Sequence, residues 1–342
     1  MDFTTTEDFP ENEIEFDARF SNPKACYEYL FKQKWPEGFH CTKCGHTTYW
    51  LSSRNLYICT QCEHQHSLTA GTIMDSSKKP ITYWFKAMWW FTTRKSGVNA
   101  VNLQELLGFG SYHTAWSWLQ KLRRCTIRQE REKLSGRVEV DECFIGGQKS
   151  GKRGRGANGK TIVAVAVERW IVQKRIGRIR LQTILDCSAY SLETFILEHI
   201  ESGSTIATDS WSSYQGVEKD QYAHEKTNQS KALDNEGLYG AHLITSLIKR
   251  LIRGTYQGRF EPKYLQNYLD EYVFRFNRRK SKSIGKKFMR IVQQAVKSAK
   301  ITYEKIQWDV DPISEFYCTW ALWITAIWKS TMEKNVSNPW LP

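Results

Sequence analysis

Two aspartates, Asp141 and Asp209, are the residues of this 342-residue chain whose type and setting best suit catalytic chemistry. Each lies in a segment with the apolar pattern of a β-strand, RVEVDECFI for Asp141 and STIATD for Asp209. Carboxylate oxygens are hard ligands that suit Mg²⁺ or Mn²⁺. If the two strands are neighbours, the carboxylates can share two metal ions that activate a nucleophile and stabilise the leaving oxygen of a phosphodiester.

Strand alternation separates Asp141 from the acid that follows it, Glu142, because successive side chains point to opposite faces of a sheet. Glu142 shares its face with the apolar Val138, so we expect that face to point into the core. Asp141 shares its face with Glu139. Asp141 is therefore the better candidate for a metal site.

A run of glycines and cations, GGQKSGKRGRGANGK, follows the first strand directly. Cations beside carboxylates would hold a polyanion through its phosphates, and glycine lets the backbone approach it closely. The alternative is a solvated hairpin loop, with the stems of some cations covering apolar surface. The candidate DNA-contacting residues, here and in the later basic segments, are Lys149, Lys152, Arg153, Arg155, Lys160, Lys249, Arg250, Arg278 and Arg279.

Four cysteines form two CxxC pairs, Cys41/Cys44 and Cys59/Cys62, separated by 14 residues. Each pair presents two thiolates in one tight turn, and two such knuckles close a tetrahedral zinc shell. We therefore predict one structural Zn²⁺. The nearby His46, His64 and His66 are expected at the surface or against DNA, because four thiolates already fill the shell.

The composition favours an intracellular protein that binds polyanions. Lys and Arg outnumber Asp and Glu by 49 to 36, which favours nucleic acid or an anionic membrane surface as the partner. Nine cysteines, four of them in knuckles, indicate metal binding in a reducing compartment. No apolar run reaches the length of a membrane span, and the acidic start does not suit a secretory signal.

The periodicities predict an α/β chain. Helical spacing covers 22–34 and 80–129, where the turn Gly108–Gly110 suits a helix-turn-helix, although an ordinary αα-hairpin has the same pattern. Further on we expect strands at 137–145, 160–169, 178–187 and 204–214, and helices near 190–202, 238–253, 262–277 and 284–305. Three strands, a helix and a strand ending in Asp is the order of an RNase H-like mixed sheet with flanking helices.

These elements divide the chain into five parts. We expect an acidic lead at 1–21, a zinc ribbon with a preceding helix at 22–75, a helix-turn-helix at 80–130, an RNase H-like domain at 137–306 and a Trp-rich tail of unassigned role at 307–342.

From about residue 17 to about 306 the chain resembles the DDE-type transposases of bacterial insertion sequences that begin with a zinc ribbon, a group related to Merlin transposons and carrying an ISXO-type transposase domain. The resemblance rests on KWPEGFHCTKCG, SLTAGTIM, WFKAMWW, VEVDECFIGG, TDSWSSY, HLITSLIKRLIRGTYQG and KYLQNYLDEYVFRFNRR. It implies a metal-dependent recombinase that binds element ends, cleaves DNA and joins 3′-hydroxyls to target DNA. By position, Asp141 and Asp209 would be its first two catalytic acids.

The third acid of the resembling family has no acidic counterpart here. Many relatives carry Glu followed seven residues later by Lys; here Lys249 is preceded at that spacing by His242. Seven residues are about two helical turns, so both side chains share a face. Neutral imidazole can bind a metal, which makes His242 the candidate third ligand. Glu271, in YLDEY, is the alternative carboxylate, with a structural role as the competing interpretation.

Three functions remain open from the sequence. The first is an active transposase working as a homo-oligomer on double-stranded DNA, at element ends and target, without a membrane. The second is a decayed or domesticated relative that binds DNA without cutting it. The third is a zinc-ribbon transcription factor. For each we expect a DNA-associated intracellular protein, in the cytoplasm or nucleoid of a bacterium or the nucleus of a eukaryote.

Overall fold

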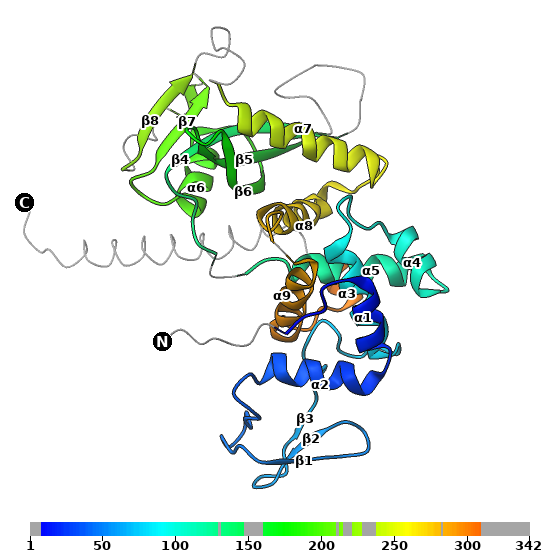
Figure 1. Ribbon diagram of the computed structural model, residues 1–342. Coiled ribbons are helices and arrows are strands. Elements are labelled where there is room, and N and C mark those ends of the chain that lie inside the picture. The colour runs from blue at the N-terminus through cyan, green and yellow to red at the C-terminus, as the bar shows by residue number, and fades with distance from the viewer. Residues whose placement is uncertain are drawn as a thin grey trace, which may run out of the picture. The chain divides into compact units, whose positions relative to one another are not determined.

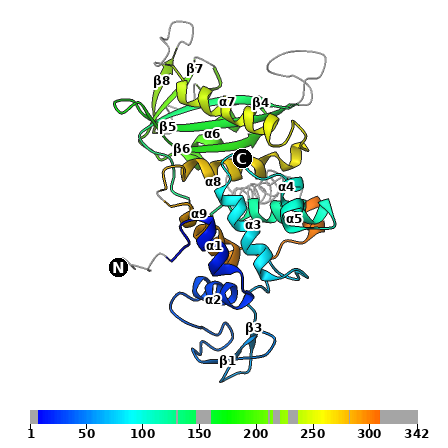
Figure 2. The same ribbon diagram turned by 45° about the vertical axis from the view of Figure 1, so that its right-hand side comes forward.

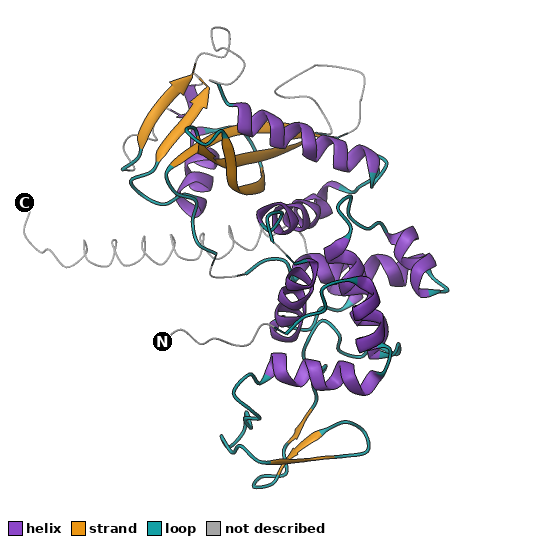
Figure 3. Ribbon diagram, in the orientation of Figure 1, coloured by secondary structure: helices purple, strands orange, loops and turns teal. Residues whose placement is uncertain are grey.

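The computed structural model describes residues 8–128, 131–146, 160–209, 212–214, 221–227, 237–281 and 283–308 (Figures 1 and 3). The chain forms two units, 1–301 and 302–342. The second contributes one described helix, α10 (Tyr303–Trp308), and the Trp-rich tail beyond it lies outside the described residues. None of the helices in the described ranges is long and apolar enough to cross a lipid bilayer.

A five-stranded mixed sheet forms the α/β part, in the order β6-β5-β4-β7-β8. The strands are β4 (Arg137–Ile145), β5 (Thr161–Trp170), β6 (Arg175–Ile184), β7 (Thr205–Asp209) and β8 (Ala223–Thr227). β4, β5 and β6 pair antiparallel, whereas β7 pairs parallel to both β4 and β8. The predicted adjacency of the Asp141 and Asp209 strands is thus confirmed. The prediction missed β8, and it ran the fourth strand too far, because Ser212–Tyr214 form a 3-10 turn.

Helices cover both faces of this sheet. α7 (Tyr239–Gly254) lies along β4 and β5 in both views (Figures 1 and 2). On the other face, α6 (Ala189–His199) contributes Leu192 and Phe195 to a core with Val138 and Val140 of β4. Alternation along β4 therefore separates a face that packs Val138 and Val140 into this core from a face that carries Glu139 and Asp141 toward α7.

The outer edge of β6 is covered by side-chain amides of α8 (Leu265–Asn277). Asn277 accepts from the Ile179 N–H (2.8 Å) and donates to the Ile179 carbonyl (3.1 Å). Gln266 accepts from the Thr183 N–H (2.8 Å) and donates to the Leu181 carbonyl (3.1 Å). Backbone groups that an edge strand leaves open are thereby satisfied.

The N-terminal half is helical apart from a small three-stranded sheet. Its helices pack with one later helix around an aromatic core that includes Trp84, Phe85 and Phe288. The elements are α1 (Glu13–Phe20), α2 (Pro23–Lys34), α3 (Ile81–Thr93), α4 (Ala100–Leu107), α5 (Tyr112–Arg124) and α9 (Ile284–Lys297), with β1 (Tyr49–Leu51), β2 (Tyr57–Cys59) and β3 (Gln65–His66).

Three expectations for this half meet different outcomes. Residues 13–20 of the expected acidic lead form α1, which buries Phe16 against Trp89 with ring centroids 4.6 Å apart. The turn between α4 and α5 is confirmed: Gly108 adopts a left-handed conformation (φ 59°) that glycine accepts at little cost. The helix expected through 305 is interrupted, because Ser298 is extended after α9.

A buried ion cluster links α5 to α8. Glu271 is fully buried, accepts from Nε of Arg123 (2.7 Å) and also pairs with Arg275. Tyr256 donates its hydroxyl to the same carboxylate (3.2 Å), and Arg123 donates to the Val98 carbonyl (3.3 Å). Three separate segments of the first unit therefore meet at one carboxylate, and Arg123 links a fourth to it at Val98.

Glu271→Ala should lower the free energy of unfolding by about 3–5 kcal/mol, because it leaves two buried guanidinium groups without their anion. Chemical denaturation followed by circular dichroism would measure this loss. Glu261→Ala is the matched control: Glu261 pairs with Lys263 at 3.2 Å but is well exposed, so its loss should stay within about 0.5 kcal/mol. Equal, small effects of both changes would contradict a structural role for Glu271.

Candidate functional site

The strand register brings Asp141 and Asp209 to corresponding positions on adjacent strands. β4 and β7 pair from Arg137↔Thr205 to Glu139↔Ala207. Asp141 lies two residues after Glu139, and Asp209 lies two residues after Ala207. Registered residues of parallel strands point to the same face, so both carboxylates belong to the face that carries α7.

The surroundings of Asp141 disfavour its ionised form. Burial and the adjacent Glu142 carboxylate raise the pKa of Asp141 to about 6, and Asp209 adds to the rise. His242 and a hydrogen bond from the Glu142 N–H act in the opposite direction. Negative charge is therefore crowded at this point of the sheet, which a divalent cation would relieve.

The imidazole of His242 lies beside Asp141. Its Nε2 is 3.5 Å from Oδ2 of Asp141, and about half of the side chain is exposed. His242 lies in the first turn of α7, and the exposed Lys249 follows about two turns later on the same helix. The structure thus brings the carboxylate and the imidazole together at the sheet surface.

Glu139, which sequence reasoning did not single out, fixes the start of α7. It is buried and accepts a hydrogen bond from the Ala241 N–H (3.1 Å), one of the N–H groups that a helix leaves without an internal partner. A side chain at Gly240 would collide with it, because a Cβ there would lie 2.8 Å from Oε2 of Glu139. Arg137 and Arg169 compensate its charge at 3.2 and 3.4 Å. In the sequence, only the spacing of two residues between Glu139 and Asp141 indicated that Glu139 lies on the same face of the sheet as Asp141.

Glu142 serves the opposite face, as alternation predicted. Its carboxylate accepts a hydrogen bond from the hydroxyl of Tyr214 (2.7 Å), which is fully buried. Burial, followed by the neighbouring Glu142 carboxylate, raises the pKa of Tyr214 well above its usual range. Tyr214 closes the motif TDSWSSY that begins at Thr208, so this bond fixes the last residue of that motif.

Eight of the nine basic residues singled out in the sequence fall into three groups, and the ninth, Arg250, is exposed on α7. Lys149, Lys152, Arg153 and Arg155 lie outside the described residues. Lys160 and Lys249 line one cavity of about 580 Å³ near the end of β4, together with Arg253. Arg278 and Arg279 stack on Phe274 and Phe276 at 4.1 and 3.9 Å and donate to backbone carbonyls, so part of their role is structural.

The four knuckle cysteines converge as a metal site requires. Their sulfur atoms all lie within 4.8 Å of one another, with Cys41–Cys62 and Cys44–Cys59 at 3.6 Å. A tetrahedron with Zn–S bonds of about 2.3 Å has sulfur separations of about 3.8 Å. The donor set and its dimensions therefore fit structural zinc.

His66 is buried, and the expectation that it lies at the surface is wrong. Its Nε2 is 3.3 Å from the sulfur of Cys41. A hydrogen bond from this imidazole would orient the thiolate and stabilise its charge. His46 contacts the hydroxyls of Thr48 and Thr60 at 2.7 and 3.1 Å and is half-buried.

Glu271, the alternative third acid, is engaged elsewhere. It is fully buried, with its oxygens directed to Arg123, Arg275 and Tyr256. Its hydrogen-bonding capacity is thus largely occupied within the protein.

Two stretches match known protein families. Residues 21–65 match the transposase zinc-ribbon domain, and residues 133–277 match the ISXO2-like transposase domain. The first contains the cysteine cluster, and the second contains Asp141, Asp209 and His242. Both agree with the resemblance seen in the sequence, so that prediction is confirmed.

Comparison with individual proteins adds little. No curated protein matches the chain significantly. Among solved structures, a chain in the cryoEM structure of the simian T-cell lymphotropic virus intasome with PP2A regulatory subunit B56 gamma is 11% identical, with a TM-score of 0.27. The match covers 52% of this chain and 63% of that chain, and a score this low does not establish a shared fold.

Cys44→Ser should remove the zinc. We expect about one zinc per wild-type chain by elemental analysis and close to none in the variant, because a structural site needs all four ligands. Limited proteolysis should then cut 41–66 faster, since the ribbon has little core of its own. Cys187→Ser, a cysteine remote in sequence from the knuckles, should retain the metal. Full zinc in Cys44→Ser would contradict the assignment.

Proposed function

We propose that this chain, which carries the two domains of the zinc-ribbon insertion-sequence transposases, is a DNA transposase that cleaves phosphodiesters at element ends and transfers the strands into target DNA. The observation that carries the proposal is the meeting of Asp141, Asp209 and His242 at the α7 face of the sheet, within the stretch that matches a transposase domain. The strand order and the flanking helices support an RNase H-like core for this stretch.

Asp141 and Asp209 would hold two Mg²⁺ or Mn²⁺ ions, and His242 would complete the ligand set. Carboxylate oxygens suit these cations, and the crowding of charge around Asp141 fits a site that gains by binding them. Bound cations would supply activation of the attacking hydroxyl and stabilisation of the leaving oxygen. Imidazole brings no negative charge, so this site balances less of the metal charge than three carboxylates would.

The remaining residues of the site position these ligands or hold the substrate. Glu139 sets the start of α7 and thereby the place of His242. The hydrogen bond between Glu142 and Tyr214 holds the last residue of the motif that contains Asp209. Lys160 and Lys249 would contact phosphate oxygens of a bound strand; their lining of one cavity next to the end of β4 supports this role.

The N-terminal half would recognise the element ends. The zinc ribbon offers a small metal-stabilised surface, and α4 with α5 has the length and turn of a helix-turn-helix. The partner is then double-stranded DNA, and cutting two ends together calls for a homo-oligomer on the DNA. The protein would be DNA-associated in the cell.

A second candidate function is favoured by the missing third acid. His242 stands where many relatives carry Glu, and Glu271 is committed to buried arginines. A chain of this kind could still bind DNA without cleaving it, as a decayed or domesticated transposase. A zinc-ribbon transcription factor accounts for the cysteines but not for the paired aspartates.

Asp141→Asn, Asp209→Asn and His242→Ala should each lower metal-dependent nicking of the protein's own element-end DNA by roughly 10²-fold or more, the scale of losing one group that stabilises transition-state charge. DNA binding, measured by mobility shift, should be unchanged. His242→Glu should retain nicking, since a carboxylate at this position also binds the metal.

Glu261→Gln serves as the control, because Glu261 is an exposed carboxylate paired with Lys263. Nicking kept in His242→Ala would remove His242 from the ligand set. Binding without nicking by the wild type would favour the second candidate function. Loss of binding in both aspartate variants would assign those residues a structural role.

A further inference from the structure

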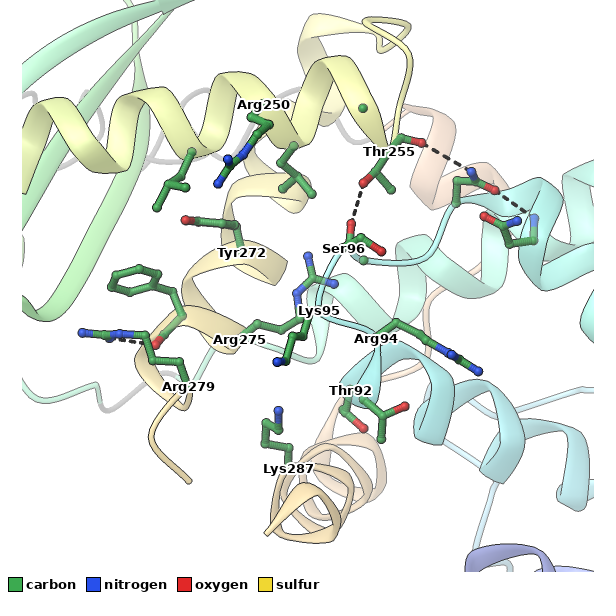
Figure 4. Close-up of a pocket in the computed structure, with 18 residues that line it drawn as sticks. Thr92, Arg94, Lys95, Ser96, Arg250, Thr255, Tyr272, Arg275, Arg279 and Lys287 are labelled. Atoms are coloured by element: carbon green, nitrogen blue, oxygen red, sulfur yellow. Dashed lines mark hydrogen bonds between the residues drawn. The ribbon is translucent and has the colours of Figure 1, made fainter. Parts of the chain in front are cut away.

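A second basic site lies away from the carboxylates, in a cleft between the helical half and α7 (Figure 4). The cleft has a volume of about 790 Å³, and its walls come from the segment after α3, the C-terminal half of α7, and α8 and α9. No acidic side chain is among its lining residues. The cations that line it are Arg94, Lys95, Arg250, Arg275, Arg279 and Lys287.

Arg275 makes this a built site rather than a chance gathering of surface charge. Its side chain is only 9% exposed, and one guanidinium nitrogen pairs with Glu271. The other, Nη2, is buried without a hydrogen-bond partner among the described residues. The backbone at Gly97 passes so close that a Cβ there would lie 2.9 Å from Nη2, and φ of +83° at Gly97 also requires glycine. A buried, unpaired cationic donor faces the cleft.

The neighbouring lysines gather around the same point. Figure 4 shows Lys95 and Lys287 beside Arg275, whereas Arg94 is directed away from them. Arg94 is engaged by Glu13 at 3.9 Å and by the ring of Trp90. Partial burial, followed by repulsion from Arg275 and Lys95, lowers the pKa of Lys287. An anion in the cleft would relieve this repulsion.

The cleft is continuous with the basic surface near the candidate active site. Arg250 and Gly254 line the cleft and also a shallower hollow on α7, which includes Lys249 and Arg253. Those two residues in turn line the cavity that holds Lys160. Cations therefore follow a path around the C-terminal half of α7, from the end of β4 to the cleft.

We propose that this cleft holds the phosphate backbone of DNA on the far side of α7 from the carboxylates. Arg250 lies eight residues from His242, about 12 Å along the helix. At about 3.4 Å per nucleotide of duplex, the contacted phosphates therefore lie several nucleotides from the bond beside His242. The position of the scissile phosphodiester beside His242 rests on the proposed function, whereas the binding of DNA in the cleft does not depend on it.

The lining chemistry favours nucleic acid over an acidic peptide. Beside the cations it offers hydroxyl and amide groups, from Thr92, Thr93, Ser96, Asn99, Asn102 and Thr255. Such side chains, with Arg and Lys, are the usual donors to phosphate oxygens. The contacts would be independent of sequence.

The triple variant Lys95→Gln/Arg250→Gln/Lys287→Gln tests this contact. All three side chains are exposed or half-buried, and none forms an ion pair within the described ranges, so the variant should fold. The probe is a short labelled duplex of arbitrary sequence, titrated by fluorescence anisotropy between about 50 and 200 mM salt. The slope of log K against log salt should become shallower by about 2 to 3, since each phosphate contact contributes about 0.9.

Two controls separate the cleft from general charge. Lys297→Gln removes an exposed lysine of the same helix, about 15 Å from Lys287, and should leave the slope within error. Lys95→Arg/Lys287→Arg preserves the charge and should preserve the slope. An unchanged slope in the triple variant overturns the proposal, as does an equal loss per charge removed, about 0.9, with Lys297→Gln. Displacement of the labelled duplex from the wild type by polyglutamate as effectively as by unlabelled duplex would favour an acidic peptide and also overturns it.

The nicking assay separates this proposal from the proposed function. If the triple variant has a shallower slope but the wild type does not nick DNA, DNA binding in the cleft is supported and the active enzyme is rejected. If the wild type nicks DNA but the triple variant has an unchanged slope, the active enzyme is supported and DNA binding in the cleft is rejected.

Discussion

A single buried carboxylate, Glu271, is the constraint on which the arrangement of the first unit depends. It neutralises Arg123 of α5 and Arg275 of α8, and through these residues it fixes the segments at Val98 and Tyr256. Buried ions are unfavourable unless they are paired, so the two helices hold these positions only together. The same pairing holds Arg275 at the wall of the basic cleft. The charge that stabilises the scaffold and the charge offered to a ligand thus belong to one cluster.

The sequence was sufficient for the elements that carry strong local signals. The CxxC knuckles predicted the converging sulfurs, and alternation along β4 predicted that Asp141 and Glu142 serve opposite faces. The strand order predicted that β4 and β7 pair, which places Asp141 beside Asp209. The first two predictions depend on residue spacing within one segment, and the third depends on a common order of segments. Spacing and segment order can both be seen directly in the amino-acid sequence.

Other features depend on contacts between distant segments and gave little local signal. β8 has the polar sequence AHEKT and becomes a strand because β7 offers it an edge. α1 belongs to the core through Phe16 and Phe20, within an otherwise acidic stretch. Glu139 and Glu271 look like ordinary surface acids, yet both are buried, and each binds a group that lies 102 or 148 residues away, Ala241 for Glu139 and Arg123 for Glu271. His66 is buried because the folded knuckle needs its imidazole beside Cys41.

The side-chain amides that cover β6 set an order of events during synthesis. Thr183 and Gln266 are 83 residues apart, so β6 leaves the ribosome well before the helix that covers it. At 5–20 residues per second, the strand edge stays open for roughly 4–17 s. During that interval the nascent sheet can pair with a strand from a neighbouring chain. A chain that ends before α8 would keep that edge permanently, so truncated products of this gene would be prone to aggregate.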